Sequence, residues 1–399
     1  MEKTCVGIVG AGPAGLVVAH VLQRQGIGFV VLEREALADL SGRPKAGVVE
    51  YRSVELLRRE GIAGSILEFS DDNHRCEFRT PEGSMVLDYG ALTGGRPHYI
   101  YPQHQLVQRL CETLVAGGGD VRFGHQVDGV GQGSDGVLLS VAGPDGSSTK
   151  IRCDVVVGCD GSRSAVAAAM NEIRIVEQSL PARFLVVVGA APPLEDHTIY
   201  AAHPRGFAGH MRREPTKTRY YLEVPLTDTA ADWPEQRVGD ELSVRLGMGG
   251  RLEGVAFEEI GLLDLRVRMI DCMQQGRLFL AGDAAHLITP AGGKGMNLAI
   301  QDAVELARGL IERFGTNQDD KRLSMYSDTR LPAIWRTQAF SNWFLHIILA
   351  SLRGGEELDT AAPGDFGRGL RGGWVSALET DPLLARWFAH AYAGVDPEP

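Results

Sequence analysis

One stretch near the N-terminus constrains the fold more than any other. A short apolar run at residues 6–9 leads directly into the turn sequence GAGPAG at residues 10–15. A helical pattern follows over 16–25, and a second apolar run over 29–32 ends in Glu33. A strand, a glycine turn, a helix, a second strand and an acid about 20 residues on form the fingerprint of a dinucleotide-binding unit. We therefore expect a Rossmann-like α/β layer that binds a dinucleotide.

Each fingerprint position has a physical task. Gly10 permits the tight turn, and Gly12 lets backbone amides approach a pyrophosphate at the positive end of the helix. Gly15 allows helix and strand to pack closely, and Glu33 can accept hydrogen bonds from ribose hydroxyls. The alternative is a glycine turn that serves packing alone.

Composition limits the classes of partner. A length of 399 residues predicts two or three domains, and 44% hydrophobic with 23% charged residues is typical of a globular protein. The net charge of −11 argues against nucleic acid. The six cysteines include no C-x-x-C pair, which favours reduced thiols over disulfides or a metal site. No signal peptide or membrane span is expected, so a cytoplasmic location is predicted; homodimerisation is left open.

The rest of the chain divides into segments with different expected secondary structure. Short strands and turns are expected at 65–100, a hairpin at 137–157, and strands of a second, mostly antiparallel sheet from 183 to about 264. Helices are expected at 50–60, 101–114 and 296–313, and in most of the region to about 350. The glycine-rich residues 353–373 are predicted as a loop, and the segment up to Tyr392 as helix.

Three glycine or acid motifs follow apolar strands. They are the turn at Gly10, the pair Asp160-Gly161, and the pair Gly282-Asp283. In a doubly wound sheet the carboxyl ends of the strands gather at one edge, where ligands bind. One large cofactor that contacts all three motifs is the simplest interpretation.

These motifs carry a family resemblance. GAGPAG at 10–15, CDG at 159–161 and GDAAH at 282–286, with longer stretches at 31–34, 200–207, 219–221 and 276–297, resemble the single-component (class A) flavin-dependent aromatic hydroxylases. The resemblance covers nearly the whole chain. It implies FAD, NADPH or NADH as electron donor, O₂, and a phenolic acid hydroxylated through a flavin C4a-hydroperoxide.

The resemblance also implies the domain plan. Residues 1–72, 101–180 and 268–350 would form a discontinuous FAD-binding domain, and residues 73–100 and 181–267 an inserted β-sheet domain for the substrate. Residues 351–399 would form a helical C-terminal region.

The cofactor contacts are carried over residue by residue. Reduced flavin carries negative charge at its N1–C2=O edge, and the helix N-terminus near Met296 would stabilise it. Asp283 would bond the ribityl hydroxyls, with a turn cap as the alternative. The complete set that the resemblance assigns to FAD is Gly10, Gly12, Ala14, Gly15, Glu33, Arg34, Arg43, Lys45, Val48, Gln103, Asp160, Asp283, Gly295, Met296 and Asn297.

The substrate contacts follow partly from strand periodicity. Met211 and Arg213 alternate onto one face of a strand, and Arg219 and Tyr221 lie on the following strand. A guanidinium matches a carboxylate bidentately. The resemblance implies a carboxylate clamp at Arg213 and Tyr221, with an exposed strand-face cation as the alternative. The resemblance also assigns Tyr200 to the substrate-binding residues.

A proton relay is implied by the same resemblance. Tyr200, Tyr392 and His74 would carry the phenolic proton outward, because the ring must become phenolate-like before oxygen attacks it. Taken alone, His74 could equally be an ordinary surface histidine. Pro290 would lie at the flavin edge.

Binding of the nicotinamide donor has no second dinucleotide unit to support it. The resemblance assigns the donor to surface cations, Arg34, Arg43, Lys45, Arg163 and Arg266. NADPH is the expected donor and NADH the alternative, since Lys45 and Arg163 depart from the family pattern. Ala167 also breaks the family's D-G-x-x-S-x-x-R pattern.

Several positions differ from the family around the substrate axis. Met211 replaces a serine, Phe184 a tryptophan, and the small residues Thr198, Gly209, Ala291 and Gly293 stand where larger or bulkier ones are usual. Voids are rare in packed interiors, so an enlarged ligand is expected. The prediction is 3-amino-4-hydroxybenzoate, hydroxylated at C2 as in similar enzymes of antibiotic pathways.

Plain 4-hydroxybenzoate, hydroxylated at C3, is the alternative substrate. A flavin halogenase, an isoprenoid reductase and a non-catalytic redox-responsive flavoprotein are the competing classes. The halogenase is disfavoured by the lack of a W-x-W-x-I-P motif.

Overall fold

The computed structural model describes residues 1–41, 47–81, 83–316, 318–349 and 365–395. Its first elements are β1 (Glu2–Val9), α1 (Pro13–Arg24) and β2 (Phe29–Glu33), and β1 pairs in parallel with β2. The predicted βαβ unit is therefore confirmed. The helix begins at Pro13, three residues before the predicted start, because the fixed φ of proline suits the first helical turn.

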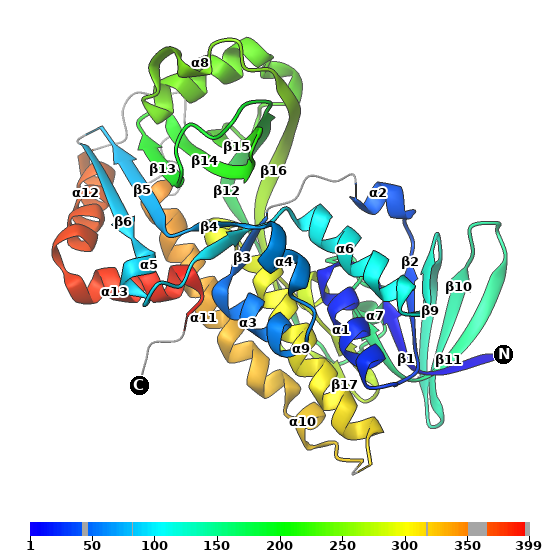
Figure 1. Cartoon of the computed structure of the whole chain (residues 1–399). Helices are drawn as coiled ribbons and strands as arrows, with labels where there is room; N and C mark the ends of the chain where they lie inside the picture. Colours follow the sequence, from blue (N-terminus) through cyan, green and yellow to red (C-terminus); the bar gives the residue numbers. More distant parts are fainter. Residues whose placement is uncertain (42–46, 82, 317, 350–364, 396–399) are drawn as a thin grey trace.

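The first sheet has the strand order β17-β18-β11-β1-β2-β8; β10 also pairs antiparallel with β11, and β9 pairs antiparallel with β10 (Figure 1). Its further strands are β8 (Val121–Phe123), β9 (Gln126–Gly133), β10 (Gly136–Ala142), β11 (Ser148–Gly158), β17 (Gln274–Gln275) and β18 (Leu278–Leu280). In the parallel register Val9 is opposite Gly158, and Gly158 is opposite Leu280. The three motifs predicted to share one edge thus begin beside one another.

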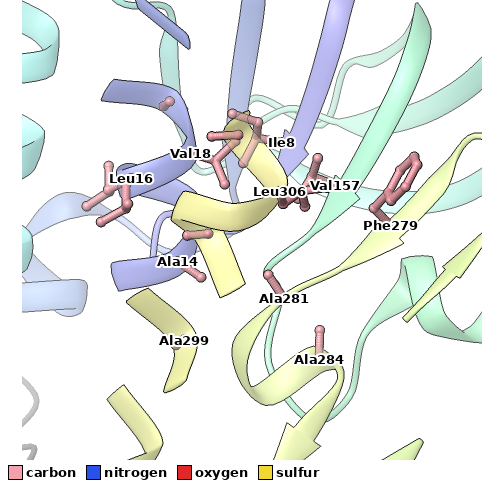
Figure 2. Close-up of a cluster of buried hydrophobic side chains, with 14 of the residues drawn as sticks. Ile8, Ala14, Leu16, Val18, Val157, Phe279, Ala281, Ala284, Ala299 and Leu306 are labelled. Carbon is pink, nitrogen blue, oxygen red and sulfur yellow. The ribbon is translucent and has the colours of Figure 1, made fainter. Parts of the chain in front are cut away.

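The core of this layer lies between the sheet and its helices. Figure 2 shows Ile8 of β1, Val18 of α1, Val157 of β11 and Leu306 of α9 (Lys294–Phe314) in one cluster, and all four are fully buried. Burial of each such side chain contributes about 1.5–3 kcal/mol relative to exposure. The helices α6 (Gln103–Ala116) and α9 both pack against α1.

The second sheet has the order β19-β16-β12-β15-β14-β13-β5-β6 and is antiparallel except where β13 meets β5. Its strands are β5 (Arg75–Thr80), β6 (Gly83–Asp88), β12 (Ile175–Gly189), β13 (Thr198–His203), β14 (Gly206–Glu214), β15 (Lys217–Val224), β16 (Phe257–Ile270) and β19 (His286–Leu287). A second, mostly antiparallel layer is therefore confirmed. A small third sheet contains β3 (Val48–Glu50), β4 (Asp71–Asn73) and β7 (His98–Ile100).

Two helices correct the sequence-based prediction. Helix α8 (Glu235–Leu246) lies within the stretch predicted as strands only, and covers the top of the second sheet in Figure 1. Its buried Val238, Leu242 and Leu246 show the i, i+4 spacing of an amphipathic helix. Helix α12 (Asp365–Thr380) replaces the second half of the loop predicted at 353–373, whose first part lies outside the described residues.

Tertiary packing explains why α12 forms despite its glycines. A glycine in a helix interior costs about 1 kcal/mol relative to alanine. Leu378 is buried, and the ring of Trp374 meets the ring of Trp343 edge-on at a centroid distance of 5.2 Å. These contacts offset the poor intrinsic propensity of the segment.

An aromatic core joins the second sheet to the C-terminal helices α11 (Tyr326–Ile348) and α13 (Pro382–Ala393). Phe344 and Phe388 meet edge-on at 5.6 Å, and Phe344 also meets Tyr200 of β13 at 4.8 Å. This packing places the C-terminal helices against the second sheet. The remaining helices are α2 (Leu37–Ser41), α3 (Tyr51–Arg59), α4 (Gly64–Phe69), α5 (Tyr89–Leu92), α7 (Ala165–Ala168) and α10 (Lys321–Ser324).

Three further features concern the cysteines, metal sites and membrane spans. All six cysteines are free thiols. In the described part of the chain no cluster of three or more His, Cys, Asp or Glu residues is arranged to hold a metal ion. None of the helices described there is both long enough and apolar enough to cross a membrane.

Candidate active site

A cavity of about 760 Å³ lies where the carboxyl ends of the first sheet face the second sheet. It is lined by all three predicted cofactor motifs, by β14 and β15, and by the end of α13. The predicted site residues that line it are Gly10, Gly12, Ala14, Glu33, Arg34, Val48, Gln103, Asp160, Arg163, Tyr200, Met211, Arg219, Tyr221, Asp283, Pro290, Gly295, Met296 and Tyr392.

Backbone geometry at the first turn explains its glycines. Gly10 has a φ of +100°, and a Cβ there would lie 2.4 Å from the carbonyl oxygen of Cys159. A Cβ on Gly15 would lie 2.0 Å from the carbonyl oxygen of Gly10. A Cβ on Gly12 would meet nothing within 4 Å, so the backbone there faces open space at the N-terminus of α1. Two glycines thus serve packing, and the third leaves room for a ligand.

Glu33 has a structural task as well as the predicted one. Its Oε2 accepts a hydrogen bond of 2.7 Å from the amide of Ala11, and its Oε1 accepts one of 3.0 Å from the amide of Glu35. The carboxylate therefore holds the glycine turn in place. Its contact with a ribose stays a prediction.

The second and third motifs present two carboxylates to the cavity. Asp160 accepts a 2.7 Å hydrogen bond from the amide of Ala165 through Oδ2, while its buried Oδ1 has no partner among the described residues. Burial raises the pKa of this carboxyl group. Asp283 is exposed on the cavity wall, and no side chain among the described residues forms a hydrogen bond with its carboxylate.

A buried network that the sequence reasoning missed supports Asp283. The preceding amide, of Gly282, donates to Oδ2 of Asp302 at 3.1 Å. Asp302 also contacts Nε2 of His286 at 2.5 Å and accepts from Nε of Arg330 at 2.7 Å. Burial opposes ionisation of Asp302, but His286 and Arg330 lower its pKa to about 2. The spacing of these residues offered no signal in the sequence.

The start of α9 differs in part from the prediction. Gly295 and Met296 line the cavity, whereas the Asn297 side chain faces inward and bonds β3 instead. Its Nδ2 donates to the carbonyl of Val48 at 3.0 Å, and its Oδ1 accepts from the amide of Glu50 at 2.8 Å. This side chain is thus a brace, and only the backbone at 297 stays a predicted cofactor contact.

Lys294 is a further residue that the sequence reasoning missed. Its buried ammonium lies 2.5 Å from Oε1 of Glu50 and donates to the carbonyls of Ala391 and Tyr392 at 2.7 Å each. Burial lowers the pKa of Lys294, while Glu50 opposes that shift. The ion pair connects the start of α9 to the end of β3, and the two hydrogen bonds to carbonyls connect it to the end of α13.

These features fit a bound FAD. One cavity is lined by the open backbone at Gly12, by Glu33 at the end of β2 and by Asp160, whose Oδ1 has no partner among the described residues. Such a cavity offers amide donors and a helix N-terminus to a pyrophosphate and carboxylates to hydroxyl groups. Gln103 and Val48 line the same cavity.

Two arginines lie on the strands β14 and β15 beside the cavity. Met211 pairs with Arg219 across β14 and β15, whereas the register of these strands shifts between Arg212 and Glu214. The regular alternation predicted from Met211 to Arg213 is therefore interrupted at Arg213. The Arg219 guanidinium lies 5.2 Å from the Tyr221 ring centroid, and its buried Nε and Nη1 have no partner among the described residues. Arg213 is 3.7 Å from Glu214 and does not line the cavity, although its buried Nη1 is equally unpartnered. Burial and the nearby Arg219 lower the pKa of Arg213.

The two relay tyrosines meet directly. The hydroxyl groups of Tyr200 and Tyr392 are 2.9 Å apart, and both side chains are buried. Burial raises the pKa of each phenol well above its ordinary value. Both groups are therefore neutral at physiological pH, and either can donate to the other.

His74 is not joined to this pair. No hydrogen bond in the described residues links its ring to either tyrosine, and the ring lies against Gly90, where an added Cβ would be 2.5 Å from Nδ1. A different histidine is adjacent: Nε2 of His98 is 2.8 Å from the carbonyl oxygen of Tyr392, and the rings are 4.8 Å apart. Burial and Lys294 lower the pKa of His98 to about 3. The relay role of His74 stays a prediction.

Only some of the positions that were predicted to enlarge the pocket line the cavity. Thr198 and Gly293 line the cavity, whereas Gly209, Ala291 and Phe184 do not. A Cβ on Gly209 would lie 3.0 Å from the Phe207 ring, so that ring already fills the space. Part of the enlarged-pocket argument is therefore wrong, because a neighbouring side chain occupies the volume.

Two of the predicted donor residues line the cavity, and a third lies outside it. Arg34 and Arg163 line the cavity, and Arg34 is 3.9 Å from Glu35. Arg266 is exposed outside it, with Nη2 3.5 Å from Oγ of Ser162. Arg43 and Lys45, predicted for FAD and the donor, lie outside the described residues.

Comparison with known proteins gives the family. Residues 3–341 match the family model described as FAD binding domain. The p-hydroxybenzoate hydroxylase of Acinetobacter baylyi is 32% identical, with 87% of this chain and 86% of that protein covered. A 12-dehydrotetracycline 5-monooxygenase/anhydrotetracycline 6-monooxygenase of Streptomyces rimosus is 30% identical over 82% of this chain, which spans 66% of that relative.

Solved structures share the fold over the full chain. The p-nitrophenol 4-monooxygenase of Pseudomonas putida has a TM-score of 0.85 at 21% identity, with all of both chains covered. The anhydrotetracycline hydroxylase of Streptomyces rimosus has a TM-score of 0.77 at 25% identity and covers 100% of this chain and 77% of its own. The match at 32% identity, together with a family model over most of the chain, assigns this protein to the family of FAD-dependent aromatic monooxygenases.

Proposed function

We propose that this monooxygenase hydroxylates a phenolic acid of the 4-hydroxybenzoate type, with 3-amino-4-hydroxybenzoate, hydroxylated at C2, as the favoured substrate. The supporting observation is one cavity that carries two different polar groups. The unpartnered guanidinium of Arg219 lies on its wall, and so does the hydrogen-bonded pair Tyr200–Tyr392. A molecule with a carboxylate and a phenolic hydroxyl satisfies both.

The arginines supply the carboxylate site. A buried N–H without a partner costs free energy, and a carboxylate that accepts from it recovers about 1.5–3 kcal/mol. Arg219 faces the cavity directly, and Arg213 stands one strand away with its own unpartnered Nη1. We assign the carboxylate to this pair, with the Tyr221 ring beside it.

The tyrosines supply the proton path. The substrate hydroxyl donates to Oη of Tyr200, and Tyr200 in turn donates to Oη of Tyr392 at 2.9 Å. This chain of hydroxyl groups favours a phenolate-like ring, which an electrophilic oxygen attacks more readily. FAD, when bound, supplies the redox chemistry that activates O₂ after reduction by NAD(P)H.

We assign the rest of the cavity to the cofactor and its electron donor. The carboxylates of Asp160 and Asp283 and the backbone at Gly12 are assigned to FAD, and Pro290 and Met296 to the flavin edge. Arg34 and Arg163 on the rim, with Arg266 nearby, are assigned to the nicotinamide donor. Each of these assignments is part of the proposal.

The alternative substrate is plain 4-hydroxybenzoate, hydroxylated at C3. The Phe207 ring favours this unsubstituted acid, because it already fills the space beside Gly209. Thr198 and Gly293 favour the substrate with a ring substituent, because both residues are small and line the cavity. Oγ1 of Thr198 already accepts a 3.3 Å hydrogen bond from Nδ2 of Asn73, so its hydroxyl is oriented.

The test compares both acids with the purified FAD enzyme. The measurement is kcat/KM, the coupling of NAD(P)H oxidation to product, and the position of the new hydroxyl by mass spectrometry and NMR. Higher kcat/KM and tighter coupling with the amino compound support the proposal. Tight coupling with unsubstituted 4-hydroxybenzoate alone supports the alternative, and no stimulation by either acid contradicts both.

A further inference from the structure

A second cavity, larger than the first, has no part in the proposed reaction. Its volume is about 1360 Å³, and it lies among α5, α9, α11 and α13. Lys294 lines both cavities, so the Lys294–Glu50 ion pair forms part of the wall between them. The second cavity is therefore a separate space on the far side of this ion pair.

Aromatic rings form one side of this cavity. Phe340, Trp343 and Trp387 line it. The Trp387 ring meets Trp343 at 5.0 Å and Phe340 at 5.8 Å, in edge-on arrangements that hold the rings firmly. Trp387 is nevertheless 47% exposed, so part of its surface is available to a ligand.

Positive charge forms the other side. Arg52, Arg96, Arg336 and Arg386 line the cavity, and the one carboxylate among its described lining residues, that of Glu50, is already paired with Lys294. Arg52 and Arg96 have interaction partners of their own. Within the described part of the chain, Arg336 and Arg386 make no ion pair with a carboxylate. Arg336 and Arg386 thus give the described wall of the cavity a positive charge, in a chain whose net charge is −11.

We propose that this cavity is a second binding site, which takes an aromatic anion with two or more rings. Aromatic walls stabilise a flat apolar body, and guanidinium groups bind carboxylate or sulfonate. Pockets for small molecules usually measure about 300–1,000 Å³, so this cavity has room for more than a single ring. The second site itself does not depend on the substrate assigned to the first cavity, whereas the use of 4-hydroxybenzoate to block that cavity rests on the proposed function.

The test uses the full-length FAD enzyme and the probe 8-anilinonaphthalene-1-sulfonate. Fluorescence titration is carried out with 4-hydroxybenzoate at saturation, so that the catalytic cavity is blocked. The matched ligand is N-phenyl-1-naphthylamine, which has the same rings without the charge. One saturable site is expected for the sulfonate, with binding at least about tenfold weaker for the neutral analogue.

Variants locate the site. Arg336→Gln combined with Arg386→Gln is expected to weaken sulfonate binding at least about tenfold. Arg313→Gln, at an α9 arginine that pairs with Asp320 away from the cavity, is the matched control and should leave binding unchanged. Thermal melting and FAD content verify that each variant is folded.

Several results would overturn the proposal. They are equal binding of the neutral analogue, wild-type affinity in the double variant, or full displacement of the sulfonate by 4-hydroxybenzoate. A stable dimer by light scattering that binds no sulfonate would also overturn it, because a second copy of the chain would then cover the face. None of these outcomes bears on hydroxylation itself, which is measured separately.

Discussion

The hydroxyl groups of Tyr200 and Tyr392 lie 2.9 Å apart although 192 residues separate them along the chain. Tyr200 is held by β13, and Tyr392 lies near the end of α13. The Phe388 ring, one helical turn before Tyr392, stacks on it at 5.3 Å. The contact therefore depends on the packing of the C-terminal helix α13 against the second sheet.

Replacement of Tyr200 tests the proton path. Tyr200→Phe should lower the rate of hydroxylation at least about tenfold, with a much smaller change in substrate affinity, because the hydroxyl acts mainly in oxygen transfer. Stopped-flow measurement separates flavin reduction from hydroxylation. Tyr220→Phe, on β15 outside the cavity, is the matched control. A wild-type hydroxylation rate in Tyr200→Phe would remove the relay assignment.

Replacement of Arg213 tests the carboxylate site. Arg213→Ala should raise the dissociation constant of the phenolic acid about tenfold or more and leave FAD affinity unchanged, since a charge-assisted contact contributes about 1.5–3 kcal/mol. Equilibrium titration of flavin absorbance measures both. The neighbouring Arg212→Ala is the control, because its guanidinium pairs with Asp71 instead. If substrate binding is the same in Arg213→Ala as in the wild type, Arg219 alone holds the carboxylate.

Replacement of Asp283 tests the cofactor site. The purified protein should be yellow and contain noncovalent FAD, and Asp283→Ala should release FAD more readily because hydrogen bonds to the ribityl hydroxyls are lost. Fluorescence of released FAD measures the change. Asp328→Ala, an exposed residue of α11, provides the comparison. Equal FAD retention in both variants would contradict the assignment.

Asp302 should make stability depend on pH. Its pKa is about 2 in the folded protein against 3.8 ordinarily, so its ionised form favours folding by roughly 2 kcal/mol. This contribution is complete above the ordinary pKa and is lost as the pH falls through about 2.

The Asp302→Asn variant isolates that contribution. Since His286 and Arg330 lose their carboxylate partner, unfolding free energy at pH 7 should fall by about 3–5 kcal/mol. The deficit should shrink on acidification toward pH 2, as measured by urea titration at several pH values. A deficit that is constant with pH would show that the charge of Asp302 is not responsible. FAD retention should weaken too, because Asp302 holds the amide of Gly282.

Local sequence determined the dinucleotide layer. The turn at Gly10 needs a positive φ and a close backbone approach that other residues cannot adopt, so its sequence specifies its structure. Apolar runs followed by acids at Glu33, Asp160 and Asp283 also located the edge of the sheet where the cavity forms. Alternation on β14 placed Met211 on the face that it shares with Arg219.

Only the tertiary structure decided which side chains face the cavity. Arg213 and Arg219 look equivalent in the sequence, yet Arg219 alone lines it. The Phe207 ring fills the space beside Gly209, and His98 rather than His74 contacts Tyr392. Local patterns specify backbone turns and strand faces, because these depend on neighbouring residues. Side-chain contacts between distant elements depend on how those elements pack, and the sequence pattern contains no direct record of that packing.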